Sequence, residues 1–178
     1  MPVLNGDDCS SVTAPARRCV PEGTVSQQRG FLCSAAKIAE GIALLCRYYA
    51  RPEAWVVPPS MQDALHRIRQ AGVKVCVVSN FDDRLRPLLA AMDLDHLFDE
   101  IIVSSEVGAE KPNPKIFDAA CSAMGVDPSS DFVLHVGDDR RNDVWGARAC
   151  GIDAWLWGED VRCFDEIADR IVTGYTTL

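Results

Sequence analysis

Three carboxylates crowd one short stretch of the chain. Asp138, Asp139 and Asp143 lie within HVGDDRRNDV, residues 135–144, directly after the apolar run FVLHV and a glycine. Carboxylates clustered at a strand tip suit Mg²⁺, because this ion prefers hard oxygen ligands and keeps several waters. The alternative is structural: Asp139 and Asp143 would favour the start of the next helix, and Asp138 would be a turn residue. This segment alone leaves both interpretations open.

Polar groups follow two other apolar runs in the same way. Ser79 and Asn80 end VVSNFD, where a hydroxyl and free helix amides suit a phosphate oxygen, although such residues are more often helix caps. Lys111 follows a second run in SSEVGAEKPNPKIF, and Pro112 restricts its backbone to extended geometry. A lysine there is usually a surface charge. Locked by Pro-x-Pro, it can instead aim its ammonium across the sheet edge, toward a phosphate and an acidic nucleophile.

The elements that must position these residues alternate regularly from residue 60 onward. Short apolar runs predict strands at 73–79, 100–105, 132–136 and 153–157. Helices are predicted over SMQDALHRIRQAG with Ser60 as N-cap, over DDRLRPLLAAMDL from about Arg86, over 113–125 with Asn113 as cap and Gly125 as terminator, over RNDVWGARACG, and over FDEIADRIV. The alternation predicts an α/β fold with a doubly wound parallel sheet, whose ligands bind beyond the carboxyl ends of the strands.

The chain divides into three predicted regions. Prolines and glycines break residues 1–30, which we expect to form a disordered or variable tail. Residues 31–58 are expected to hold one amphipathic helix and a proline-rich linker, because apolar residues recur there at steps of three and four. Residues 59–178 form the predicted α/β core.

Composition narrows the partners and the compartment. The net charge of −8 makes nucleic acid an unexpected partner, since no basic stripe could neutralise phosphates. No apolar run approaches the roughly 18 residues of a membrane span, so no membrane partner is expected. The eight cysteines form no Cys-x-x-Cys pair, and this pattern favours a reducing compartment and a cytoplasmic location. The stretch SSVTAPARRCV keeps an organelle, chloroplast or mitochondrion, as the alternative.

The hydroxyl, the lysine and the paired acids thus come on successive strand tips in that order. At these residues the chain resembles the haloacid dehalogenase (HAD) superfamily of hydrolases: VVSNFD looks like its second motif, EKPNPKIF its third and VGDDRRND its acidic fourth. The stretches YYARPEAW, SNFDDRLRPLL, SSEVGAEKPNPKIF and GIDAWLWGEDV are most similar to the HAD-like hydrolase domain-containing protein 3 group, especially plant-like members. The resemblance covers residues 47–172 and implies a Rossmannoid core.

The resemblance also implies a chemistry for these residues. In this superfamily an aspartate attacks phosphorus to form an aspartyl-phosphate, Mg²⁺ shields the charge, and water then releases phosphate. Ser79 and Asn80 would hold the phosphoryl group of a small phosphorylated substrate, and Lys111 would orient that group and the nucleophile. Asp138 would bind Mg²⁺, with Asp143, or less favourably Asp139, completing its shell.

The superfamily's first motif, an apolar strand ending in Asp-x-Asp, has no match here. Asp93 and Asp95 have the right spacing but come after the second motif and follow a helix. We therefore expect a truncated chain or a pseudoenzyme, with impaired catalysis, Mg²⁺ binding that is weak or absent, and most of the helical cap missing apart from the helix in 31–50. Without a central strand, the sheet must close up, take a foreign strand or leave unpaired backbone groups.

Other functions were weighed against this one. A non-catalytic HAD-like module that binds a phosphorylated ligand or a protein partner is the main alternative. A receiver-type signalling domain fails on order, because its acid pair comes first whereas here it comes last. A dinucleotide-binding domain fails because no Gly-x-Gly-x-x-Gly follows the first strand.

Overall fold

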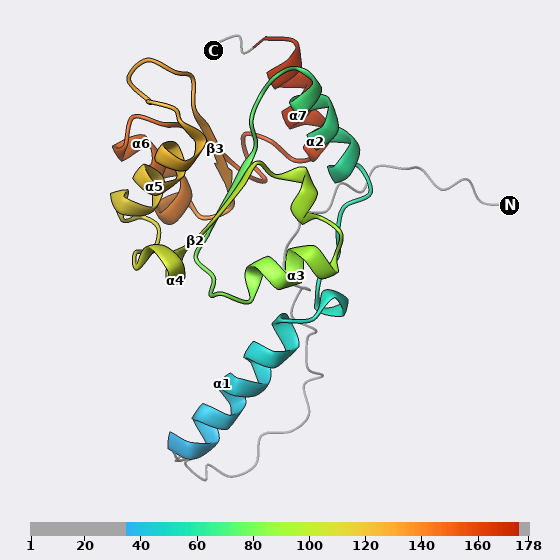
Figure 1. Cartoon of the computed structure of the whole chain (residues 1–178), viewed down its shortest axis with the longest axis vertical. Coiled ribbons are helices and arrows are strands. Elements are labelled where there is room, and N and C mark those ends of the chain that lie inside the picture. The colour runs from blue at the N-terminus through green and yellow to red at the C-terminus, as the bar shows by residue number, and fades with distance from the viewer. Residues whose placement is uncertain (1–34, 175–178) are drawn as a thin grey trace, which may run out of the picture.

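The computed structural model describes residues 35–174, and the tail predicted at residues 1–30 lies outside them. It alternates helices and short parallel strands, as the sequence predicts (Figure 1). In chain order the elements are α1 Ala35–Tyr49, η1 Pro52–Ala54, α2 Met61–Gln70, β1 Cys76–Ser79, α3 Leu85–Ala91, η2 Asp95–Leu97, β2 Glu100–Val103, α4 Ser104–Val107, α5 Pro114–Met124, β3 Leu134–Gly137, η3 Arg140–Trp145, α6 Gly146–Ala149, β4 Asp153–Leu156 and α7 Phe164–Val172. No helix among the described residues is long and apolar enough to cross a membrane.

The strands form two parallel pairs rather than one sheet. β1 pairs with β2 in the register Cys76 to Glu100, and β3 pairs with β4 in the register Leu134 to Asp153. No ladder joins β1 to β3 within residues 35–174. The predicted α/β class with four strands is confirmed, and within residues 35–174 these four strands form two separate parallel pairs.

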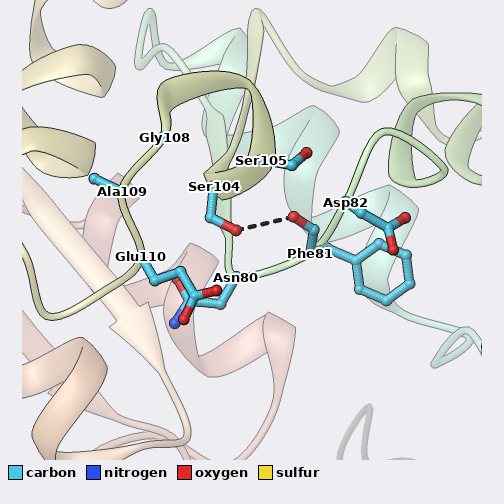
Figure 2. A pocket seen from close by; sticks show the side chains of 8 residues that line it. All are labelled: Asn80, Phe81, Asp82, Ser104, Ser105, Gly108, Ala109 and Glu110. Atoms are coloured by element: carbon cyan, nitrogen blue, oxygen red, sulfur yellow. Dashed lines mark hydrogen bonds between the residues drawn. The ribbon is translucent and has the colours of Figure 1, made fainter. Parts of the chain in front are cut away.

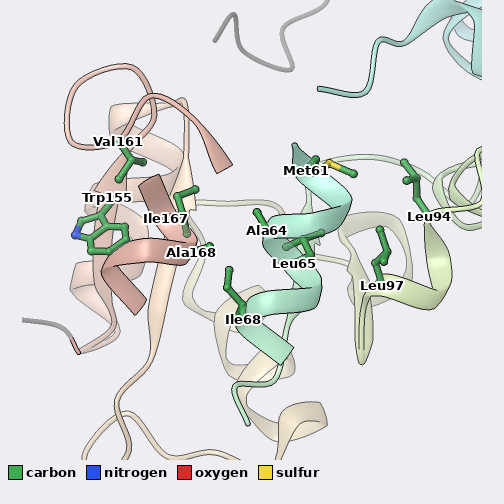
Figure 3. Close-up of a cluster of buried hydrophobic side chains, with 10 residues drawn as sticks. All are labelled: Met61, Ala64, Leu65, Ile68, Leu94, Leu97, Trp155, Val161, Ile167 and Ala168. Carbon is green, nitrogen blue, oxygen red and sulfur yellow. The ribbon is translucent and has the colours of Figure 1, made fainter. Parts of the chain in front are cut away.

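Helices cover both faces of the strands. On one face α2 packs along α7, and the apolar side chains of these helices meet Trp155 of β4 and Leu97 of η2 (Figure 3). On the other face Ile116 and Phe117 of α5 pack with Ala147 of α6. Neighbouring residues of β4 serve both layers, because Trp155 faces the first cluster while Ala154 and Leu156 face the second. Both pairs of strands are therefore held inside one three-layer unit.

Several predicted boundaries are wrong, each for a local reason. Ser60 does not cap α2 with its side chain, because its backbone is already helical at φ −84° and ψ −6°. The first strand begins at Cys76 rather than residue 73, since the Val75 amide donates to the Asp99 side chain instead of a ladder. The second strand ends at Val103, where the chain turns into α4. The helix predicted over RNDVWGARACG opens as a π-helical turn, η3, before the short α6.

Other local predictions are confirmed. The Asn113 side chain accepts the Lys115 amide at 3.1 Å, so it caps α5 as expected. Gly125 ends that helix at φ +64°, a conformation that glycine adopts without strain. The predicted helix in residues 31–50 is α1, which extends away from the layered unit (Figure 1). Its apolar side chains at Ile42 and Leu45 are more than half exposed.

Candidate functional site

Asn80 fixes the loop that carries Lys111. Its side-chain oxygen accepts the Lys111 amide at 2.7 Å, and its side-chain nitrogen donates to the Lys111 carbonyl at 3.0 Å. The backbone of Lys111 is thus held against the carboxyl end of β1, and the following bond to Pro112 is cis. Asn80 was expected to contact a phosphoryl group, yet both of its polar side-chain atoms are engaged by this loop.

The Lys111 ammonium lies between the two strand pairs. Nζ donates to the Val78 carbonyl of β1 at 2.8 Å and to Oδ1 of Asp143 at 2.7 Å. Its side chain is only 12% exposed. An ammonium carries three N–H groups, so the two contacts leave one donor for a further acceptor. The predicted meeting of the lysine with the acidic strand tip therefore occurs, through Asp143.

Asp143 is a buried carboxylate with protein partners on both oxygens. Oδ1 contacts Lys111 Nζ and lies 2.9 Å from Nε2 of His135, while Oδ2 accepts the Asp139 amide at 2.9 Å. Burial alone would raise the pKa of Asp143, but the hydrogen bonds from His135 and Lys111 outweigh it and hold the pKa well below its usual range. Asp143 is therefore a permanent anion that orients the lysine.

Gly137 makes room for this buried carboxylate. A Cβ placed at Gly137 would lie 2.2 Å from Cγ of Asp143, a distance that no side chain could occupy without displacing the aspartate. The close approach of the Asp143 side chain is therefore a structural reason for glycine at this position. The end of β3 therefore packs closely against the π-helical turn η3 at the Asp143 side chain.

Asp138, Asp139 and Ser79 differ from Asp143 in their exposure and in their hydrogen-bond partners. Asp139 caps η3, since its Oδ1 accepts the amides of Arg141 at 2.8 Å and Asn142 at 2.7 Å. Asp138 is exposed, and its side chain makes no hydrogen bond or ion pair with the rest of residues 35–174. The Ser79 hydroxyl, half-buried at the end of β1, likewise has no hydrogen-bond partner in this range. Among the predicted site residues, Asp138 and Ser79 have side chains without a hydrogen-bond partner in the described part of the chain.

The donor set fits a partial magnesium site. Mg²⁺ commonly takes one or two carboxylates, completed by waters and by phosphate oxygens. Asp138 offers a free carboxylate at the strand tip, whereas both oxygens of Asp143 are already occupied by protein donors. A bound ion would therefore meet Asp138 directly, and Asp143 would act through the lysine and the Asp139 amide.

The other acidic cluster lies elsewhere. Asp93, Asp95 and His96 form an exposed group around η2, at the turn that leads into the amino end of β2. Because Ser79, Lys111 and Asp138 lie at the carboxyl ends of strands, the Asp93–Asp95 pair is at the opposite edge. It does not replace the missing first motif.

A pocket of about 540 Å³ opens beside the site, beyond the tips of β1 and β2 (Figure 2). Its wall is formed by Asn80, Phe81, Asp82, Ser104, Ser105, Gly108, Ala109 and Glu110. The Ser104 hydroxyl donates to the Phe81 carbonyl at 2.9 Å and ties the two loops together. Of the predicted site residues only Asn80 lines it, so the pocket adjoins the lysine rather than containing it.

Sequence reasoning missed His135 and the carbonyl of Val78 as members of the site. Both lie inside predicted strands, where the pattern reports burial but not the partner of a backbone or ring atom. A histidine within the otherwise aliphatic run FVLHV was the one available signal. Its ring also packs edge-on against Phe117, with centroids 5.5 Å apart.

A layered α/β unit with a lysine and acids at its strand tips defines a class of hydrolase. The model of the haloacid dehalogenase-like hydrolases matches residues 18–151, and the chain belongs to this family. It is similar to haloacid dehalogenase-like hydrolase domain-containing protein 3 of Bos taurus, 36% identical over 69% of this chain and 47% of the relative. It is also 35% identical to glyceraldehyde 3-phosphate phosphatase of Methanopyrus kandleri, over 58% of this chain and 42% of that protein. The chain spans about half the length of the curated relatives it matches.

Solved structures agree with this assignment. A HAD phosphatase from Thermococcus onnurineus superposes with a TM-score of 0.62 at 30% identity, over 74% of this chain and 63% of that one. The hydrolase YfnB of Bacillus subtilis, described as bound to magnesium, superposes with a TM-score of 0.60 at 22% identity, over 78% of this chain and 68% of that one. The predicted superfamily and its similarity to the domain-containing protein 3 group are confirmed.

Proposed function

We propose that residues at the strand tips bind the phosphoryl group of a small phosphorylated ligand. The observation that carries the proposal is the Lys111 ammonium, whose side chain is only 12% exposed and which is held 2.7 Å from Asp143 with one N–H left over. The free Ser79 hydroxyl at the end of β1 supplies a second donor. Phosphatases among the relatives, including phosphoglycolate phosphatase of Haemophilus influenzae at 35% identity, support a phosphate monoester as the ligand class.

Magnesium belongs to the same proposal. Asp138 would hold the ion together with waters and a phosphate oxygen, and the ion would neutralise charge on the phosphoryl group. Lys111 would donate to that group, and its 2.7 Å contact with Asp143 fixes the direction of the ammonium. Asn80 contributes by holding the loop rather than by touching the ligand.

Hydrolysis by this chain is proposed to be impaired. Formation of an aspartyl-phosphate needs a carboxylate nucleophile in line with phosphorus. Asp143, the carboxylate that Lys111 contacts within residues 35–174, is engaged by protein donors on both oxygens. The proposed function is therefore binding of a phosphorylated ligand at the residues around Lys111, Ser79 and Asp138. The chain itself would hydrolyse that ligand slowly or not at all.

The test separates binding from turnover. Purified full chain is titrated with inorganic phosphate and Mg²⁺ by calorimetry and then assayed with p-nitrophenyl phosphate. We expect Mg²⁺-assisted phosphate binding that falls at least about tenfold in Ser79→Ala and Asp138→Asn, equal to about 1.4 kcal/mol, with no turnover above buffer. Absence of phosphate binding would overturn the ligand assignment.

A second measurement addresses the impairment alone. Beryllofluoride forms a stable adduct only where a carboxylate nucleophile is present, so we expect no stoichiometric adduct by mass spectrometry. Mg²⁺-dependent turnover of p-nitrophenyl phosphate that disappears in Asp138→Asn would show that the chain is an active phosphatase, and would contradict the impairment.

A further inference from the structure

We propose that His135 is a positioning residue of the phosphate site: its ring N–H fixes the Asp143 carboxylate and thereby the direction of the Lys111 ammonium. His135 does not touch the ligand and acts only through these two side chains. This role of His135 rests on the proposed phosphate binding, and it adds a residue of β3 that determines how tightly phosphate is held.

The hydrogen bonds around Asp143 define which partner donates. The pKa of Asp143 lies well below its usual range, so both carboxylate oxygens act only as acceptors. Oδ1 lies 2.9 Å from Nε2 of His135 and 2.7 Å from Nζ of Lys111, and Oδ2 accepts the Asp139 amide at 2.9 Å. Nε2 of His135 therefore carries a proton and donates a hydrogen bond to Oδ1.

The bond from His135 fixes the plane of this carboxylate. Rotation of an aspartate carboxylate about its last side-chain bond is only weakly restricted by the side chain itself. The Asp139 amide holds Oδ2 alone and leaves the plane free to turn about that contact. Lys111 cannot prevent this rotation, because an ammonium on a flexible stem follows its acceptor. The second fixed donor, on Oδ1, is Nε2 of His135.

His135 is suited to this role because the core holds its ring. The side chain is only 13% exposed, and the ring packs edge-on against Phe117 with centroids 5.5 Å apart. Phe117 is itself fully buried. His135 and Gly137 are alternate residues of β3 and so face the same side of the strand, where the Asp143 carboxylate lies against both. A regular strand therefore locates this carboxylate.

The orientation of Asp143 sets the direction of the lysine. Nζ of Lys111 donates to the Val78 carbonyl at 2.8 Å and to Oδ1 of Asp143 at 2.7 Å. In a tetrahedral ammonium, two fixed N–H directions determine the third, which is the one left for a phosphoryl oxygen. Without the bond from His135, Oδ1 can turn away, and the ammonium can rotate about its bond to Val78. The third N–H then has no defined direction.

Two variants at one position separate the N–H donor from the ring. His135→Leu and His135→Gln both remove the ring and its contact with Phe117, but glutamine keeps a side-chain N–H donor at a similar reach. Urea unfolding of the full chain compares their stability, and inorganic phosphate is titrated by calorimetry in the presence of Mg²⁺. We expect the phosphate dissociation constant to rise about tenfold in His135→Leu and to stay within about threefold of the wild type in His135→Gln.

A second measurement follows the lysine itself and needs no phosphate. Exchange of the Lys111 ammonium protons with water is followed by NMR, with the exposed Lys115 as the reference in the same protein. We expect exchange at Lys111 to be slower than at Lys115 in the wild type and in His135→Gln. In His135→Leu it should become at least about threefold faster at Lys111 and stay unchanged at Lys115.

Several outcomes would overturn the role of His135. These are wild-type phosphate affinity in His135→Leu, or equal losses in the two variants, which would assign the effect to the ring. A loss of about tenfold in His135→Gln would contradict it also where His135→Leu does not fold. If the wild type binds no inorganic phosphate, the proposed function fails, and the exchange at Lys111 still decides whether His135 positions the lysine. Faster exchange in His135→Leu alone supports that positioning, and unchanged exchange contradicts it.

Discussion

Lys111→Met removes the ammonium between the two strand pairs while it keeps the length of the side chain. The lysine nitrogen and the Asp143 oxygen are 2.7 Å apart, and their side chains are 12% and 5% exposed. At an effective dielectric constant of about 20, unit charges at this distance attract by roughly 6 kcal/mol before desolvation is subtracted. Loss of one partner of a buried pair costs about 3–5 kcal/mol, because the other charge stays buried.

The lower end of that range applies here. Asp143 keeps its contacts with His135 and with the Asp139 amide, so we expect the free energy of unfolding to fall by about 3 kcal/mol. Urea unfolding at pH 7 measures this change, and Lys115→Met, an exposed lysine on α5, is the matched control with a change within about 0.5 kcal/mol. Equal losses in both variants would refute the assignment of Lys111 as a buried charge partner. A cycle with Asp143→Asn should give a coupling of about 2 kcal/mol.

The remaining predictions concern the same strand tip. Gly137→Ala places a Cβ 2.2 Å from Cγ of Asp143, so it should lower the free energy of unfolding in urea by about 1–3 kcal/mol. Gly41→Ala on exposed α1 is the control and should raise that free energy by about 0.5–1 kcal/mol. An unchanged free energy in Gly137→Ala would contradict the close approach. Asp139→Ala should cost about 1 kcal/mol through loss of the η3 cap, and Asp138→Ala under about 0.5 kcal/mol; equal effects would refute that distinction. The pKa of Asp143 is lower in the folded than in the unfolded protein, so ionised Asp143 stabilises the fold fully above the ordinary pKa near 4. This contribution to the free energy of unfolding is lost as the pH falls below that value. Unfolding measured from pH 7 to 3 should show the loss in the wild type and not in Asp143→Asn.

The sequence predicted the class of fold and the meeting of Lys111 with the acidic tip for one physical reason. Parallel strands bring their carboxyl ends to one edge, so residues that follow successive apolar runs become neighbours even when they are far apart in sequence. The lysine and Asp143, 32 positions apart, meet in this way. The relation of each acid to its neighbours could not be predicted, because Asp138, Asp139 and Asp143 share one chemistry and only the turn geometry separates them.

Element boundaries failed where a side chain competes with a backbone ladder. The Asp99 carboxylate accepts the Val75 amide, and the first strand begins at Cys76, the residue after Val75. The Asp139 carboxylate accepts two amides at the start of the following turn, and that turn is π-helical. Both are carboxylate-to-amide bonds, which hydrophobic periodicity does not report. The same limitation hid Asn80, whose pairing with the Lys111 backbone depends on three-dimensional proximity.

A backbone carbonyl oxygen accepts up to two hydrogen bonds, so a lysine can contact the end of a strand through such an oxygen. Within residues 35–174 β1 pairs with β2 alone, and the Lys111 ammonium donates to the Val78 carbonyl at the end of β1 at 2.8 Å. Lys111 therefore joins the end of β1 to Asp143, and one N–H of its ammonium is left for a further acceptor.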